Sequence, residues 1–110
     1  MNNLEEMKNN AKKVWSGFAP LENLTGTAAP RLIKFANISK NQKILDVACG
    51  TGVVALTAAR TGANVFGSDL TPELLERAEE NNKLFKLNVK FTEADVEKLP
   101  YDDAFFDVVL

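Results

Sequence analysis

Short apolar, β-prone runs alternate with helical patterns through the second part of the chain, and this alternation constrains the fold more than any other feature. The apolar runs occupy residues 44–48, 64–68, 88–92 and 106–110. The helical patterns occupy residues 53–60 and, with Thr71 as the expected cap and Pro72 at the first position, 72–86. Strands that alternate with helices at this spacing form βαβ units around a parallel sheet. Right-handed crossovers place the second and third strands successively to one side of the first.

Two helices are predicted before the first strand. Apolar residues recur at steps of three and four at Leu4, Met7, Ala11, Val14, Trp15 and Phe18, which is the spacing of one helical face. Charged residues lie largely on the other side of this helix, namely Glu5, Glu6, Lys8, Lys12 and Lys13. Gly17 and Pro20 end the helix, a loop is expected at 25–27, and Pro30 opens a second helix. Its buried side is expected to comprise Leu32, Ile33, Phe35, Ala36 and Ile38.

Composition and charge exclude several classes of protein. The 110 residues suffice for one domain at most, with N-terminal helices at 1–40 and βαβ units at 41–110. A net charge of −2, with acids and bases mixed, gives no basic surface for nucleic acid or a membrane. No apolar run approaches the roughly 20 residues of a membrane span. The single cysteine fits a reducing cytoplasm, and the lack of histidine removes most zinc-binding and Ser-His or Cys-His chemistry, so no metal site is expected.

A glycine-rich turn follows the first strand, in the sequence Ile44-Leu45-Asp46-Val47-Ala48-Cys49-Gly50-Thr51-Gly52. In open α/β sheets, ligands bind at the carboxyl end of such a strand. Gly50 and Gly52 allow a sharp turn and close approach of a ligand, and the next helix directs its first amides at the same place. Asp69 ends the second strand 19 residues after Gly50, a distance at which an acid commonly binds ribose hydroxyls. The turn and Asp69 together predict a nucleoside-containing cofactor.

Two classes of cofactor compete for this turn. Residues 50–55 match a relaxed dinucleotide fingerprint, with alanine in the third glycine position. Asp46 argues against a dinucleotide, because its carboxylate would lie beside the pyrophosphate. An acid at this place favours a ligand with a cationic ammonium or sulfonium group. Asp95 ends the third strand, where an adenine amino group could be met, and a dinucleotide-binding oxidoreductase remains the more distant alternative.

Four motifs in order resemble the class I S-adenosylmethionine-dependent methyltransferases, and most closely their ubiquinone/menaquinone-biosynthesis-like small-molecule group. The motifs are DVACGTG at 46–52, VFGSDLTPELL at 65–75, FTEADVEKLPY at 91–101 and FDVV at 106–109. The resemblance extends from about residue 15 to the last residue. It implies a Rossmann-like α/β fold, with a parallel sheet of order 3-2-1-4 and helices on both faces.

The resemblance also implies a role for each residue that would contact the cofactor, S-adenosylmethionine or S-adenosylhomocysteine. Asp46 and the turn after it would hold the methionine part. Asp69 would bind the ribose hydroxyls, with Leu70 packed on the adenine, and Asp95 would bind the adenine amino group beside Val96. The N-terminal helix would lie over the cofactor, and no catalytic residue is implied. The complete set comprises Trp15, Phe18, Asp46, Ala48, Cys49, Gly50, Thr51, Gly52, Asp69, Leu70, Asp95 and Val96.

Several of these residues also have a purely structural interpretation. Asp46 could cap the helix that follows the turn, Asp69 could stabilise the next turn, and acids such as Asp95 are common after edge strands. Trp15 and Phe18 fit core packing at least as well as cofactor contact.

No catalytic role is assigned to the thiol of Cys49 or to Tyr101. Cys49 is a small residue suited to tight packing, because nothing near it in sequence would deprotonate its thiol. Tyr101 belongs with Asp102 and Asp103 to an expected solvated turn.

The last residues, 105–110, form part of an apolar run. A complete family sheet has seven strands and this chain supplies at most four, so we expect the N-terminal, cofactor-binding half of a methyltransferase, truncated after the fourth strand. Two classes of function stay open: an enzyme with a small-molecule acceptor whose remaining half lies elsewhere, and a binding module that turns nothing over alone. The bare edge of the fourth strand predicts a homo-oligomer, most simply a two-fold dimer.

Overall fold

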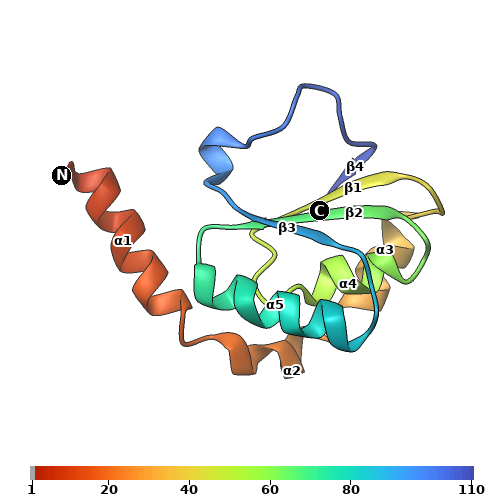
Figure 1. Cartoon of the computed structure of the whole chain (residues 1–110), viewed down its shortest axis with the longest axis horizontal. Helices are drawn as coiled ribbons and strands as arrows, with labels where there is room; N and C mark the ends of the chain where they lie inside the picture. The colour runs from red at the N-terminus through yellow and green to blue at the C-terminus, as the bar shows by residue number, and fades with distance from the viewer. Residues whose placement is uncertain (1) are drawn as a thin grey trace.

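A four-stranded parallel sheet forms the centre of the molecule (Figure 1). The structure, a computed structural model, describes residues 2–110. Its strands are β1 (Lys43–Val47), β2 (Asn64–Asp69), β3 (Lys90–Glu93) and β4 (Val108–Val109). They pair in the order β3-β2-β1-β4, and each pairing is parallel. The predicted order and direction of the strands are therefore confirmed.

Helices fill the connections and the N-terminal region. They are α1 (Asn3–Trp15), η1 (Ala19–Leu21), α2 (Glu22–Thr25), α3 (Ala29–Phe35), α4 (Val53–Ala59), α5 (Pro72–Leu84) and η2 (Val96–Lys98). Helices were predicted at the places of α1, α3, α4 and α5. The helix α2 was not, because the end of this stretch was read as a loop. It begins at Glu22, whose carboxylate is bound by the guanidinium of Arg77 on α5, 2.9 Å from Nη2 to Oε1. Such a contact between distant residues leaves no local signal.

The main core lies between the sheet and the helices α3, α4 and α5, which Figure 1 shows together below the sheet. Ile44 of β1 and Val65 of β2 meet Ala55 and Ala58 of α4 there, and Ile33 of α3 closes the cluster. Alanine side chains are short, so α4 can lie close against the strands. The alanine-rich composition of this helix thereby brings its N-terminus close to the end of β1.

Aromatic side chains cover the other face of the sheet. The segment between β3 and β4 lies on that side in Figure 1, and Tyr101, Phe105 and Phe106 pack edge-on around Phe66 of β2 with ring centroids 5.4–6.0 Å from it. Among the described residues, α-helices therefore contact the sheet on one face only, although helices on both faces were expected. The expected solvated turn at Tyr101 is therefore wrong, because its ring belongs to this cluster. Alternate residues of β2 point to this face, and the apolar ring of Phe66 is covered there by the other aromatic rings.

The N-terminal helices bury less apolar surface than their sequence pattern predicts. The side chain of Phe35 is 90% exposed, because α3 turns Ala29 and Ile33 inward and these lie on its opposite side. α1 has no buried residue. Its beginning is fixed locally by a capping box, in which the Asn2 side chain accepts from the Glu5 amide and the Glu5 side chain accepts from the Asn2 amide. α1 is therefore a helix held at the surface of the domain.

Candidate functional site

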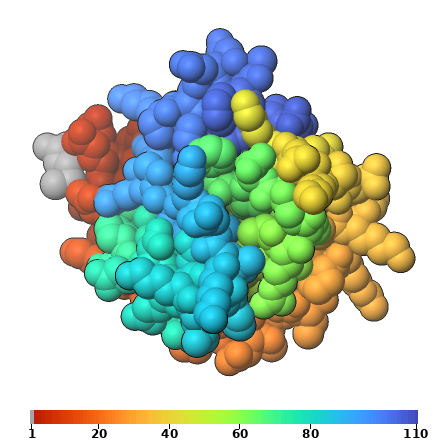
Figure 2. Space-filling model, turned by 45° about the vertical axis from the view of Figure 1, so that its right-hand side comes forward, coloured from red at the N-terminus to blue at the C-terminus, as the bar shows by residue number. Residues whose placement is uncertain are grey.

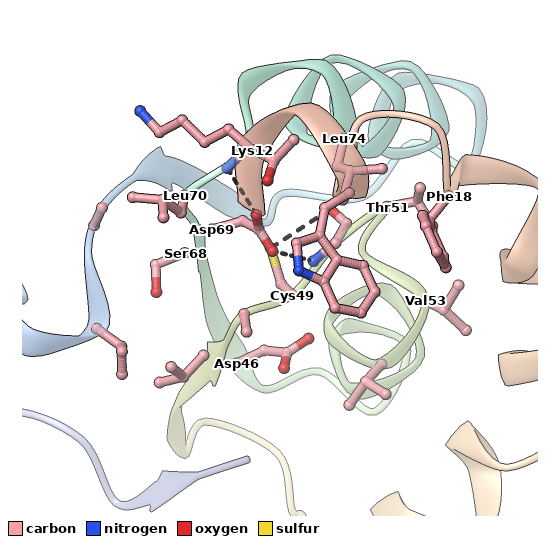
Figure 3. A pocket seen from close by; sticks show the side chains of 18 of the residues that line it. Lys12, Phe18, Asp46, Cys49, Thr51, Val53, Ser68, Asp69, Leu70 and Leu74 are labelled. Atoms are coloured by element: carbon pink, nitrogen blue, oxygen red, sulfur yellow. Dashed lines mark hydrogen bonds between the residues drawn. The ribbon is translucent and has the colours of Figure 1, made fainter. Parts of the chain in front are cut away.

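A cleft opens at the carboxyl ends of β1, β2 and β3, where the turns after these strands meet α1 and α2. Its volume is about 520 Å³, within the range of small-molecule sites. The structure brings all the predicted site residues to its lining except Gly52. Figure 3 shows Asp46 and Asp69 entering the same cavity from neighbouring strands. Residues that are far apart in sequence are thus assembled at one edge of the sheet.

The turn after β1 is built from alternate residues in the left-handed conformation. Ala48, Gly50 and Gly52 have φ angles of 55°, 57° and 84°. The Cys49 amide donates to the Ser68 carbonyl at 2.9 Å, and this hydrogen bond fixes the turn to β2. Glycine adopts positive φ without steric cost, whereas Ala48 does so at a cost of about 1–2 kcal/mol. The two glycines were predictable, but the strained Ala48 was not.

Gly52 lies behind the cleft and has a packing role. It precedes α4, and a Cβ atom at this position would lie 2.8 Å from the ring of Phe91 on β3. The same ring would lie 2.7 Å from a Cβ at Gly67 of β2. Phe91 therefore occupies space that the absence of two side chains creates, and it joins the glycine turn to β3. This contribution of Phe91 was not visible in the sequence.

Asp69 is buried at the end of β2 and organises two neighbouring turns. Its Oδ2 accepts a hydrogen bond from the Gly50 amide at 2.9 Å, and its Oδ1 accepts one from the Thr71 amide at 2.8 Å. The second bond stabilises the turn before α5, which is the structural role that the sequence allowed for Asp69. The Thr71 side chain, the expected cap of α5, makes no capping bond. A carboxylate has about four acceptor sites, so these two bonds leave capacity for a ligand.

Asp46 is a buried carboxyl with an unpartnered oxygen. The residue is 5% exposed, and its Oδ2 has no hydrogen-bond partner. The pKa of this carboxyl is raised to about 7: burial is the main cause, the Ala55 amide in the first turn of α4 acts in the opposite direction, and the nearby charge of Asp69 adds to the increase. The contribution of Ala55 agrees in part with the helix-capping interpretation. A donor that enters the cleft would satisfy this oxygen, as most buried polar groups are satisfied.

Cys49 faces the same cleft but lacks the environment of a nucleophile. Its burial and the charges of Asp46 and Asp69 raise the pKa of its thiol far above the usual range. Only the thiolate is an effective nucleophile. Its Sγ would lie 3.1 Å from a Cβ at Gly67, so the small side chain fits a tight space, as the sequence predicted.

Asp95 lies at the far end of the cleft from Asp46, after β3. Its Oδ1 accepts a hydrogen bond from the Glu97 amide at 3.0 Å and thereby caps the start of η2. Its Oδ2 accepts a hydrogen bond from the Lys8 ammonium of α1. Lys8 holds the pKa of the Asp95 carboxyl below its usual value. Val96 follows at the rim and is 60% exposed. Lys8 had been placed on the solvent side of α1, yet its ammonium contacts this carboxylate.

Trp15 and Phe18 form an aromatic wall over the cleft. Their ring centroids are 4.8 Å apart, and the two residues are 51% and 39% exposed. Neither belongs to the core, so the core-packing interpretation is wrong for both. They line the cleft from the end of α1 and the turn after it. Exposed aromatic surface at a cavity wall is available for a ligand with an apolar or planar part.

Sequence reasoning missed two charged residues of the lining, Lys12 and Glu22. Lys12 had been assigned to the solvent face of α1. Glu22 accepts from Arg77 and, at 3.3 Å, from the Asn81 amide of α5, and these bonds fix α2 against the body. Neither residue could have been found from the sequence, because each is defined by contacts with segments more than fifty positions away.

Residues 2–110 contain neither a membrane-spanning helix nor a cluster of metal-binding side chains. The helices described are too short or too polar to cross a membrane. Within the same range, no group of three or more His, Cys, Asp or Glu side chains is arranged to hold a metal ion. The candidate site is therefore the cleft at the ends of β1, β2 and β3.

Known proteins resemble this chain in sequence. The profile of a methyltransferase domain family matches residues 44–110. An uncharacterised protein of Mycobacterium tuberculosis is 42% identical over 89 residues, which are 81% of this chain and 32% of that protein. A demethylmenaquinone methyltransferase of Chlorobaculum tepidum is 42% identical over 83 residues, which are 74% of this chain and 33% of that enzyme.

A solved structure extends the comparison to three dimensions. The tRNA (uracil-54, C5)-methyltransferase of Pyrococcus abyssi, crystallised in complex with S-adenosyl-L-homocysteine, has a TM-score of 0.64 to this chain and 26% sequence identity. The match covers 76% of this chain and 21% of that enzyme. The chain spans about a third of the length of the curated relatives it matches.

Proposed function

Because this chain belongs to the class I S-adenosylmethionine-dependent methyltransferases, we propose that its cleft binds S-adenosylmethionine and the product S-adenosylhomocysteine. The observation that carries the proposal is the buried Oδ2 of Asp46, which has no partner within the chain. A buried carboxylate without a partner is costly, and a cationic ligand group would satisfy it. S-adenosylmethionine has an ammonium and a sulfonium, whereas the pyrophosphate of a dinucleotide would repel Asp46.

The other residues of the cleft fit the remaining parts of this cofactor. Asp69 has unused acceptor capacity for ribose hydroxyls beside the glycine turn. Asp95 offers a carboxylate to the adenine amino group, and Leu70 and Val96 offer apolar surface nearby. The amides after Gly50 lie at the N-terminal end of α4 and favour an electron-rich group. The donors and acceptors thus match the cofactor from end to end.

The chain's own contribution to methyl transfer is positioning and desolvation. When bound, the cofactor supplies a methyl group attached to a positively charged sulfur. Asp46 and Asp69 would hold the two ends of its polar part, so that the methyl group faces one direction. Trp15 and Phe18 would exclude water from the same space. We assign no proton transfer to any of these residues, and the thiol of Cys49 stays protonated.

We further propose that the acceptor is a small molecule and that its pocket requires elements beyond these 110 residues. The demethylmenaquinone methyltransferase of Chlorobaculum tepidum supports the first part, because it matches 74% of this chain at 42% identity. The second part is supported by the length of the same relative, of which the chain covers 33%. The chain would then bind cofactor without turnover until those elements are supplied, which is the binding-module alternative.

Calorimetric titration of the full chain tests the proposal. We expect saturable binding of S-adenosylmethionine and S-adenosylhomocysteine and none of NAD. Asp69→Ala should weaken both by at least about tenfold, because hydrogen bonds to a charged group contribute roughly 1.5–3 kcal/mol each. The exposed Asp103→Ala removes the same charge outside the cleft and should bind like the wild type. Binding of NAD, or equal affinities of the two variants, would contradict the assignment.

A further inference from the structure

The helix α1 contributes a wall of the cleft although it buries none of its residues. Ala11, Lys12 and Trp15 line the cavity from this helix. Figure 1 shows α1 at one end of the molecule, apart from the layer of α3, α4 and α5. A helix of 13 residues without buried side chains gains little from packing. Its position over the cleft must depend on other contacts.

Ion pairs to the end of β3 and to the segment after it provide these contacts. The Lys8 ammonium pairs with the carboxylates of Asp95 and Glu97, and Lys12 Nζ lies 3.3 Å from Oε1 of Glu93. The partners are more than eighty positions apart in sequence. The side chains of Lys8 and Asp95 are 27% and 25% exposed, so the pairs lie at the surface and dissolved salt weakens them.

The other end of this region is anchored separately. Glu22 at the start of α2 binds Arg77 and Asn81 of α5. Between this anchor and α1 lies a short turn that contains Gly17, where an added Cβ would meet only the Val14 carbonyl at 3.8 Å. α1 is thus joined to α2 at its C-terminal end and is held along its middle and last turn by ion pairs. Loss of the ion pairs would free α1 to swing about the turn while α2 stays in place.

We propose that α1 is a lid over the adenosine end of the cleft, and that Lys8 and Lys12 are positioning residues whose ion pairs set the rate of cofactor exchange. The inference rests on the proposed function for the identity of the ligand. The lid is assigned to the adenosine end because Lys8 binds the carboxylate of Asp95. The same carboxylate is proposed to bind the adenine amino group. A carboxylate accepts more than one donor, so closure of the lid and occupation of the cleft are compatible.

The rate of product release tests the lid directly. Radiolabelled S-adenosylhomocysteine bound to the full chain is chased with unlabelled compound at about 0.05 M and about 0.5 M salt. We expect the wild type to release it faster at high salt. The double variant Lys8→Gln/Lys12→Gln should release it about three- to tenfold faster at low salt and show little further response to salt, as exposed ion pairs are weak.

Two single substitutions control for charge and for structure. Lys13→Gln removes the same charge from the same helix, and among residues 2–110 no ion pair involves Lys13, so its release rate should equal that of the wild type. Lys8→Arg keeps the ion pairs and should restore slow, salt-sensitive release. Equal rates for the double variant and Lys13→Gln would overturn the lid.

A measurement without ligand separates the lid from the proposed function. In the free chain, hydrogen exchange of the α1 amides should be faster in Lys8→Gln/Lys12→Gln than in Lys13→Gln. Without its ion pairs, the helix opens locally more often. Unchanged exchange would overturn the lid whatever the ligand. If the wild type bound no S-adenosylhomocysteine but exchange still accelerated, the proposed cofactor would be wrong and the lid over the cleft would stand.

Discussion

At the scale of single residues, Asp46 links the stability of the fold to the function of the cleft. Its carboxyl has a pKa of about 7 against an ordinary value of 3.8, with burial as the largest cause. Well below pH 3.8 it is protonated in both the folded and the unfolded chain. As the pH rises to 7 the unfolded chain ionises first, so the free energy of unfolding falls, and above 7 the loss is constant.

We therefore expect Asp46→Asn to stabilise the free protein at pH 8, by up to about 4 kcal/mol, since one pKa unit corresponds to about 1.36 kcal/mol. The gain should be small near pH 4 and grow until the pH reaches about 7. Urea unfolding of both proteins at a series of pH values measures it. A difference that does not change with pH would show that Asp46 ionises normally.

The same substitution should weaken cofactor binding. A cationic ligand favours the ionised carboxylate, so the affinity of the wild type for S-adenosylmethionine should rise from pH 6 to pH 8 as Asp46 loses its proton. The affinity of Asp46→Asn should be lower and change less over this range. Titrations of both proteins at the two pH values provide the comparison. Both proteins keep Asp69 and Cys49, the neighbours of residue 46 in the cleft.

At the scale of elements, Phe91 connects β3 to the glycine turn through two missing side chains. Its ring lies where a Cβ at Gly52 or at Gly67 would be, at 2.8 Å and 2.7 Å. Gly67 is the partner of Asp46 in the β1–β2 register. The packing of the Phe91 ring thus sets how closely β3 approaches β2 and the turn after β1.

We expect Gly67→Ala to destabilise the fold by about 1–3 kcal/mol, because the added methyl group forces the ring and the neighbouring Sγ of Cys49 to move. Gly17→Ala is the matched control, since its new Cβ meets only one carbonyl oxygen at 3.8 Å. Chemical denaturation of the two variants measures the difference. If Gly67→Ala were as stable as Gly17→Ala, the packing of Phe91 would not control this part of the fold.

At the scale of the whole molecule, β4 is an edge strand of the sheet. It pairs with β1 on one side, and within residues 2–110 no strand pairs with its other side. Val108 packs against the core cluster, whereas Val109 is 60% exposed. Figure 2 shows the last part of the chain, in dark blue, at the surface of the molecule. An apolar strand edge at the surface is a template for pairing with another chain.

We predict that the chain self-associates, most simply as a two-fold dimer in which two copies of β4 pair antiparallel. Light scattering at high micromolar concentration should give twice the mass of the chain. Val109→Lys places a charge on the edge strand and should shift the equilibrium to the monomer. A wild type that is monomeric at these concentrations, with protected β4 amides, would rule out this interface.

The sequence by itself determined the parallel sheet, its order and the acids at its ligand edge. These depend on local signals: apolar runs of strand length, glycines at a turn that needs positive φ, and Pro72 at the start of α5. They are readable because period and backbone preference act over a few neighbouring residues. Asp46 and Asp69 could be placed together because parallel strands bring their carboxyl ends to one edge.

Only the tertiary structure decided what those acids meet. The unpartnered oxygen of Asp46 and its raised pKa depend on burial by α4 and on the charge of Asp69. The attachment of α1 through Lys8 depends on contacts with Asp95 that span most of the chain. A periodic pattern shows which residues share a helical face, but not which surface that face meets, so Lys8 and Lys12 were misplaced. Long-range packing and electrostatics decide such contacts, and both exist only in the folded chain.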